Sequence, residues 1–130
     1  MNDKVAYWVE MSDYDFDTAN AMLETKRYLY VAFMCHQVIE KILKAYWSNV
    51  LEEPPLKIHH LSRLAARSGL VGELSEEQLN FIDTLEPLNI EARYPSYKEQ
   101  LMRMLTPDYC KLLLNQTNEL RLWIKDKLSK

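Results

Sequence analysis

The first 53 residues of the chain contain neither glycine nor proline, and this absence constrains the fold more than any other feature. Within that stretch, apolar side chains recur at helical spacing over residues 3–26 and again over residues 29–51, as in helices that bury one face. Pro54-Pro55 ends the second helix, because proline cannot donate a backbone hydrogen bond within a helix. The link at Arg27-Tyr28 is so short that the two helices must fold back as an antiparallel hairpin.

The rest of the chain predicts shorter helices. Ser75 with Gln78 is a typical helix start, and residues 87–106 show the least regular pattern. Helices are predicted over residues 56–72, opened by His59-His60-Leu61 and ended by Gly69, from Ser75 to the residue before Pro87, and from Thr106 to the C-terminus. We therefore predict an all-α fold, an antiparallel up-and-down bundle of about five helices with a long N-terminal helical hairpin, as a single domain over residues 1–130.

The composition narrows the class of protein. Hydrophobic residues make up 48% of the chain and charged residues 27%, which indicates a folded protein. The formal net charge of −3 argues against nonspecific nucleic-acid binding through overall charge, although it leaves room for a local basic patch. The N-terminus has no signal-peptide pattern, and no segment reaches the roughly 18 apolar residues of a membrane-spanning helix, so we expect a cytoplasmic protein.

The cysteines and histidines do not form a metal-binding pattern. Cys35 and Cys110 lie far apart and are interpreted as reduced core thiols. His59 and His60 are adjacent, so on a helix their side chains diverge by about 100° and no third ligand is near them in sequence. His36 borders an apolar face and is interpreted as a core or interface group. We expect neither a metal nor a cofactor.

The second long helix carries a concentration of polar side chains that a purely apolar core helix would not need. Gln37, Glu40, Lys41 and Lys44 lie three or four positions apart, on one side of the helix, and are called the polar stripe below. In one interpretation the lysines bind the phosphate of a nucleotide or RNA, and Gln37 and Glu40 contact a base or a partner helix. In the other, Glu40 and Lys44 form an ion pair on an exposed face, and Gln37 and Glu40 hydrogen-bond across the bundle.

Three separated segments form a recognisable combination of motifs. They are Trp8-x3-Ser12-x2-Asp15-x3-Ala19, then Ala32-Phe33-x2-His36-Gln37-x2-Glu40-Lys41-x2-Lys44-Ala45, and finally His59-x-Leu61-x2-Leu64 together with Ala92-Arg93-Tyr94-Pro95. In this order, and over nearly the whole chain, they resemble the HEPN domain family (higher eukaryotes and prokaryotes nucleotide-binding). The resemblance implies a helical bundle, usually dimeric, and a frequent partner, a small nucleotidyltransferase encoded beside it. Many such pairs resemble toxin–antitoxin modules in which the HEPN chain is an RNase that its partner modifies and silences.

The chain departs from the RNase members of that family, which carry an Arg-x4-6-His motif late in the sequence. Its only histidines are His36, His59 and His60; Arg27 precedes His36 by nine positions, and no histidine follows Arg93, Arg103 or Arg121. Metal-free RNA cleavage needs an acid–base group near neutral pH, for which histidine is the natural choice. A metal-free endoribonuclease is therefore disfavoured, while another constellation such as His59 with Arg93 stays open.

Arg93 and Tyr94 lie in the irregular segment. Arg93 suits bidentate binding of phosphate or carboxylate, and it either contacts a ligand or pairs with Glu40 or Asp15. Tyr94 has a ring on which a base can stack. His59 either hydrogen-bonds locally or contacts a ligand. If the polar stripe is functional, Arg93 and His59 should converge on it, whereas an Arg93–Glu40 pair would make the stripe structural.

The function expected from these patterns is a HEPN-like binding module. It would bind a nucleotide or RNA, or serve as the partner of a small nucleotidyltransferase in a two-component, toxin–antitoxin-like system. The alternatives are a metal-free endoribonuclease toxin and a purely structural dimeric scaffold that uses the polar stripe as an interface. We expect a homodimer, no membrane association and no assigned catalytic residue. The candidate ligand-binding residues are Gln37, Glu40, Lys41, Lys44, His59, Arg93 and Tyr94.

Overall fold

The computed structural model describes residues 2–89 and 95–128, and within these residues it contains helices and no strands. The long helices are α1 (Asp3–Glu24), α2 (Tyr28–Val50) and α6 (Pro107–Leu128), and the shorter ones are α3 (Leu61–Arg67), α4 (Glu76–Leu85) and α5 (Pro95–Met104), with 3-10 turns η1 (Leu70–Glu73) and η2 (Glu86–Asn89). The predicted all-α bundle with a long N-terminal hairpin is confirmed. No helix in the described ranges has the length and apolar character needed to cross a bilayer.

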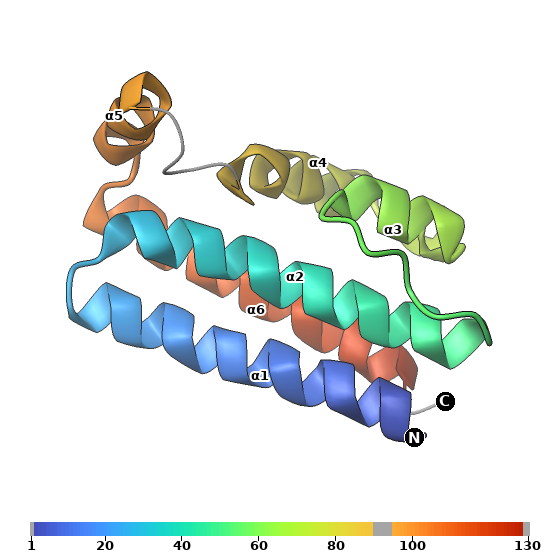
Figure 1. Cartoon of the computed structure of the whole chain (residues 1–130). Helices are drawn as coiled ribbons and strands as arrows, with labels where there is room; N and C mark the ends of the chain where they lie inside the picture. The colour runs from blue at the N-terminus through green and yellow to red at the C-terminus, as the bar shows by residue number, and fades with distance from the viewer. Residues whose placement is uncertain (1, 90–94, 129–130) are drawn as a thin grey trace.

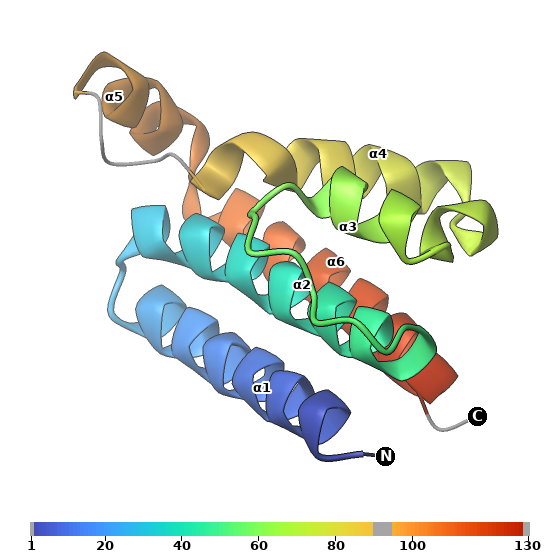
Figure 2. The same ribbon diagram turned by 45° about the vertical axis from the view of Figure 1, so that its right-hand side comes forward.

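The helices are arranged around α2. Helices α1 and α2 form the antiparallel hairpin, and α6 runs beside α2 (Figure 1). Helices α3 and α4 form a second layer across α2, while α5 stands at the end of the bundle where α1 turns into α2 (Figure 2). Because it has neighbours on several sides, α2 buries most of its length, including positions that would face water in an ordinary surface helix.

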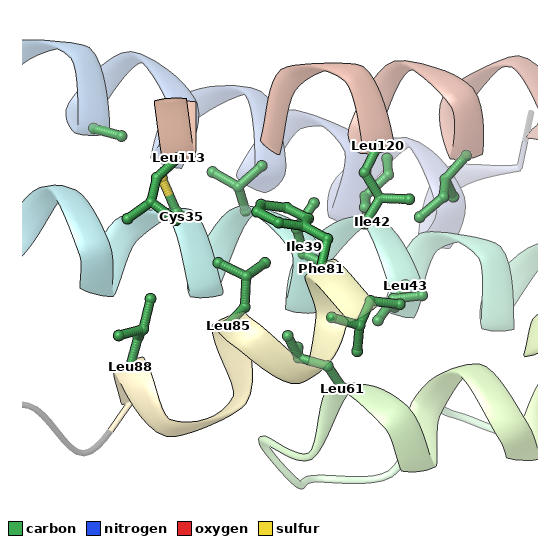
Figure 3. Packing of buried hydrophobic residues seen from close by; sticks show 14 of the residues in the cluster. Cys35, Ile39, Ile42, Leu43, Leu61, Phe81, Leu85, Leu88, Leu113 and Leu120 are labelled. Atoms are coloured by element: carbon green, nitrogen blue, oxygen red, sulfur yellow. The ribbon is translucent and has the colours of Figure 1, made fainter. Parts of the chain in front are cut away.

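The core fills the space between α2, α6 and the layer of α3 and α4. Figure 3 shows side chains from these four helices and from η2 meeting in one cluster. Fully burying such a side chain contributes about 1.5–3 kcal/mol relative to leaving it in water, so this cluster fixes how the layers sit on each other. The labelled members of the cluster are Cys35, Ile39, Ile42, Leu43, Leu61, Phe81, Leu85, Leu88, Leu113 and Leu120.

Several helix ends follow the predicted local signals. The side-chain oxygen of Ser75 accepts a hydrogen bond from the Gln78 amide, and the Gln78 side chain accepts one from the Ser75 amide, which completes a capping box. The Thr106 hydroxyl caps α6 by accepting a hydrogen bond from the Tyr109 amide at 3.2 Å. Gly69, with φ 85°, ends α3 in the left-handed conformation that glycine adopts without strain.

The prediction that residues 87–106 are irregular was wrong for Pro95–Met104, which form α5. The proline there is the first residue of a helix, where its missing N–H costs nothing, rather than a helix breaker. Leu101 and Leu105 are buried and lie four positions apart, so one side of the segment packs on the bundle. The first helix also ends slightly earlier than predicted, at Glu24.

The two cysteines are free and buried, which confirms their interpretation as reduced core thiols. Burial raises the pKa of Cys35 to about 12 and the pKa of Cys110 to about 11. Both thiols therefore stay protonated at neutral pH, and the reactive thiolate form is absent. Trp47 is fully buried, and its ring N–H donates a hydrogen bond to the Glu53 carbonyl oxygen at 2.9 Å, which holds the chain leaving α2 against the bundle.

Candidate functional site

The polar stripe lies inside the bundle rather than on an open face. Glu40 is only 2% exposed and Lys44 is also buried, because α3 and the chain before it cover this side of α2. Gln37 and Lys41 are half-buried towards α1 and η2. The predicted pair of Glu40 and Lys44 is therefore present, but the expectation that it lies on an exposed face was wrong.

Glu40 is the centre of a charge network. One carboxylate oxygen, Oε2, lies 3.2 Å from Lys44 Nζ, and the other, Oε1, lies 2.9 Å from His59 Nδ1. Lys44 Nζ also lies 5.3 Å from the centre of the Trp8 ring, a cation–π contact from α1. A buried carboxylate needs such compensation, since an unpaired charge in the core is strongly unfavourable. Glu40 thus ties α1, α2 and the segment before α3 together.

A second group of polar contacts extends the network. Lys41 Nζ lies 2.7 Å from Asp15 Oδ2 on α1 and donates to Gln37 Oε1 at 3.3 Å. The Gln37 side-chain amide donates in turn to Asn89 Oδ1 in η2 at 3.1 Å. Both lysines of the polar stripe are consequently neutralised by carboxylates, so a phosphate would have to compete with Asp15 and Glu40 for them.

His36 lies next to this network and is fully buried. Burial lowers the pKa of its imidazole, and the nearby carboxylates of Glu40 and Glu86 offset only part of that shift. Its Nδ1 lies 3.9 Å from Glu40 Oε1, and its Nε2 is buried without a hydrogen-bond partner among the described residues. The ring is therefore neutral at neutral pH, and it belongs to the core, one of the two environments, core or interface, that the sequence indicated.

His59 is the exposed end of the network. Its side chain is 64% exposed although Nδ1 contacts the buried Glu40. Because a carboxylate only accepts hydrogen bonds, Nδ1 carries the proton and donates it, which leaves Nε2 to face solvent. Ile58 on one side is partly buried against the core and Leu61 on the other is fully buried, so the backbone that carries His59 is fixed.

A pocket of about 340 Å³ opens beside this imidazole and is called the His59 pocket below. It is lined by Ile58, His59, His60, Glu86 and Asn89. The Glu86 carboxylate is held in place by Ser62, whose amide and hydroxyl donate to Oε1 at 2.7 Å and 2.9 Å. The pocket therefore offers two imidazoles, an amide and a carboxylate, with Asn89 linking it to the polar stripe through Gln37.

The structure brings together five of the seven candidate ligand-binding residues. Gln37, Glu40, Lys41, Lys44 and His59 form one connected set of contacts. Arg93 and Tyr94 lie outside the described residues. Of the two residues expected to converge on the polar stripe, His59 does so, through its contact with Glu40. Sequence reasoning missed Asn89 and Glu86 as site residues, since neither belongs to a local motif.

The described residues contain no group of three histidine, cysteine, aspartate or glutamate side chains placed to hold a metal ion. In comparison with known proteins, the chain matches the HEPN domain family over residues 5–127. The crystal structure of TT1696 from Thermus thermophilus superposes with a TM-score of 0.82 at 17% identity, over 97% of this chain and 99% of that chain, which supports the fold. No curated protein matches the chain.

Proposed function

The chain belongs to the HEPN domain family, and from this premise we propose that it is a non-catalytic binding module that binds a nucleotide or an RNA base at the His59 pocket. The observation that carries the proposal is the pairing of the exposed His59 imidazole with the buried Glu40 carboxylate. This contact fixes the ring orientation before any ligand arrives. A preoriented side chain loses less conformational entropy on binding than a free one.

The chemistry of the His59 pocket suits a base better than a phosphate. Imidazole rings present a flat face on which a base can stack. Asn89 and Glu86 provide the amide and carboxylate groups that hydrogen-bond to base edges. The Glu86 charge disfavours a phosphate in the same pocket. The neutralised lysines of the polar stripe then serve as support for His59 and Asn89 rather than as the phosphate site.

Titration of the 15N-labelled protein with adenosine monophosphate and with a short oligoadenylate tests this proposal. His59→Ala should weaken binding by about 1–3 kcal/mol, the usual cost of losing a stacked ring. Asn80→Ala, at an exposed polar position on α4 that does not line the His59 pocket, is the matched control and should bind as the parent does. Unchanged affinity of the His59→Ala protein would overturn the proposal.

A metal-free endoribonuclease is the second candidate, and one observation favours it. A histidine that donates Nδ1–H to a buried carboxylate and presents Nε2 outward has the orientation of a general base. The missing Arg-x4-6-His motif still places this candidate second. Cleavage of a broad RNA panel that disappears with both His59→Ala and Arg93→Ala would support it. Purified protein that leaves every RNA in the panel intact would exclude it for those substrates.

The partners implied by the family are part of the proposal. We expect a homodimer and a small nucleotidyltransferase partner in a two-component, toxin–antitoxin-like system. Native mass spectrometry of the chain alone and of the chain co-expressed with a neighbouring nucleotidyltransferase measures both associations directly. A third function, a dimeric scaffold without a ligand, predicts that substitutions in the polar stripe dissociate the dimer while helicity is retained. The burial of Glu40 within its own chain argues against that scaffold.

A further inference from the structure

A second hollow, of about 300 Å³, lies where the turn between α1 and α2 faces α5. Its lining includes Lys26, Arg27, Tyr28, Tyr30, Lys98 and Met102, and the hollow is called the turn pocket below. It shares no lining residue with the His59 pocket. Figures 1 and 2 place α5 and this turn at the end of the bundle, away from α3.

The charge of the turn pocket differs from that of four other hollows in the described part of the chain, one of which is the His59 pocket. Each of those four is lined by at least one carboxylate side chain, namely Asp3, Glu52 and Glu53 in one, Glu77 and Glu119 in another, Asp83 in a third and Glu86 in the His59 pocket. The lining of the turn pocket, as far as the structure describes it, contains three cations and no carboxylate. An anion entering it would displace no acidic side chain.

The three cations are also available. Lys26, Arg27 and Lys98 are exposed, and in residues 2–89 and 95–128 none of them forms an ion pair. Helix α2 begins beside them, with no acidic residue in its first turn and no side-chain cap. The positive end of the helix dipole therefore adds to the potential of the cations.

The same pocket presents apolar and aromatic surface next to the cations. Tyr30 is 45% exposed and Met102 is 58% exposed, so both side chains are accessible to a ligand in the pocket. Tyrosine rings are the surfaces on which bases stack in proteins that bind single-stranded nucleic acid. Cations beside an exposed tyrosine match the two halves of a nucleotide, a charged phosphate and a flat base.

Lys26 occupies a backbone conformation that favours glycine. Its φ is 62°, and the turn closes with the Arg27 amide bonded to the Met22 carbonyl at 2.7 Å and the Lys26 amide bonded to the Leu23 carbonyl at 3.1 Å. This is a Schellman motif, in which glycine usually takes the left-handed position. A lysine there keeps a cation at the pocket at the expense of backbone strain.

We propose that the turn pocket is a second ligand site that binds a nucleoside phosphate. Lys26, Arg27 and Lys98 hold the phosphate, and Tyr30 lies against the base. This inference shares only its class of ligand with the proposed function and uses none of the residues of the His59 pocket. A free nucleotide and the phosphorylated end of an RNA strand carry the same chemistry, so both are probes of the site.

The test is a 15N NMR titration of the full chain with adenosine, adenosine monophosphate and a short 5′-phosphorylated oligoadenylate. The monophosphate should shift the amide signals of residues 26–30 and of Lys98, and adenosine should shift them far less. The double variant Arg27→Gln/Lys98→Gln should weaken the affinity at these signals by about tenfold or more, the usual effect of losing charge-assisted contacts. The matched control Arg63→Gln/Arg67→Gln removes the same charge from exposed positions on α3 and should have little effect.

The outcomes distinguish the two sources of the phosphate and the two proposed sites. Stronger binding of the oligonucleotide than of the monophosphate identifies an RNA end as the preferred source. Signals that move only at residues 58–60 and 89 would overturn the turn pocket and leave the proposed function intact, and the reverse pattern would do the opposite. Equal weakening by the α3 control, or equal binding of adenosine, would show that the three cations hold no phosphate.

Discussion

Two groups of charges, one on helix α2 and the other around the start of that helix, differ in burial and in pairing. The polar stripe near the middle of α2 is buried at Glu40 and Lys44 and half-buried at Gln37 and Lys41, and both of its lysines are neutralised by carboxylates from α1 or from α2 itself. The cations of the turn pocket, Lys26 and Arg27 just before α2 and Lys98 on α5, are exposed, and the described lining of the pocket contains no carboxylate. Charges that stabilise a fold are those with partners, whereas charges free to bind an anion are those without.

The difference between the polar stripe and the turn pocket changes how the charged residues of the sequence are interpreted. The polar stripe attracts attention because its polar residues interrupt an apolar pattern, but in the structure its contacts bind three segments of the chain together. No sequence pattern marks the turn pocket, because Lys26-Arg27 lies in an ordinary interhelical turn and Lys98 lies 71 positions beyond Arg27. We expect variants in the two groups to separate stability from binding.

The largest effect is expected from Glu40→Ala. The change leaves the buried Lys44 without its carboxylate, and removing one partner of a buried ion pair costs about 3–5 kcal/mol. The free energy of unfolding from urea titration measures this loss. Glu40→Met/Lys44→Met should recover most of it, because an apolar pair replaces an ionic one. A loss below about 1 kcal/mol for Glu40→Ala would mean that the stripe does not stabilise the fold.

A smaller effect is expected from Lys41→Ala. It leaves the buried Asp15 carboxylate without the ammonium group at 2.7 Å, which should lower the free energy of unfolding by about 1–3 kcal/mol. Lys98→Ala is the matched control, since this lysine belongs to the turn pocket and should change stability by less than about 0.5 kcal/mol. Equal losses from the two variants would remove the distinction between paired and free cations. The same urea titrations provide the comparison.

His36 makes the stability of the core depend on pH. Because burial lowers the pKa of His36 in the folded state, only the unfolded chain takes up its proton below the ordinary value of 6.5. Stability is therefore complete above that value and falls as the pH drops towards the folded pKa, by at most about 1.4 kcal/mol per pH unit. Around the ring, the carboxylates of Glu40 and Glu86 and the backbone of His59 favour the protonated form, whereas the charge of the His59 side chain opposes it.

Urea unfolding at pH about 7.5 and about 5.5 measures this dependence. His36→Leu should reduce the difference between the two pH values, because leucine takes up no proton. It should also remove the unpaired Nε2 from the core, so we expect little loss of stability at the higher pH. The same acid sensitivity in the parent and the variant would assign the effect to other groups.

Sequence patterns predict structural features that depend on residues close together in the chain. They do not predict contacts between residues that are far apart in the chain. The hairpin, the Ser75 capping box and the Thr106 cap are local signals, and all are present. The burial of the polar stripe depends on contacts across long separations in sequence. His59 is 19 positions from Glu40, and Asn89 is 52 positions from Gln37, so the periodicity within α2 cannot predict these two contacts.

Two errors come from interpreting single residue types too simply. Pro95 was assigned to an irregular segment, although proline at the first position of a helix is compatible with α5. The end of α1 was placed too late because no glycine marks it, and a lysine takes the left-handed position instead. Because of the second error, the turn pocket was not predicted, since Lys26, the residue in the left-handed conformation at that turn, is one of the three cations of the pocket.

The smallest effect on stability is expected from Lys26→Gly, a variant that should change both stability and ligand binding. Glycine adopts a φ of 62° without strain, so the variant should be more stable than the parent by about 0.5–1 kcal/mol in urea unfolding. Glu10→Gly, at an exposed position inside α1, is the control and should instead lose about 1 kcal/mol. The stabilised variant has also lost a cation from the turn pocket, so it should bind adenosine monophosphate more weakly at residues 26–30. Gain of stability with undiminished binding would show that Lys26 holds no phosphate, whereas opposite changes in the two quantities would show that a free charge is kept at the expense of stability.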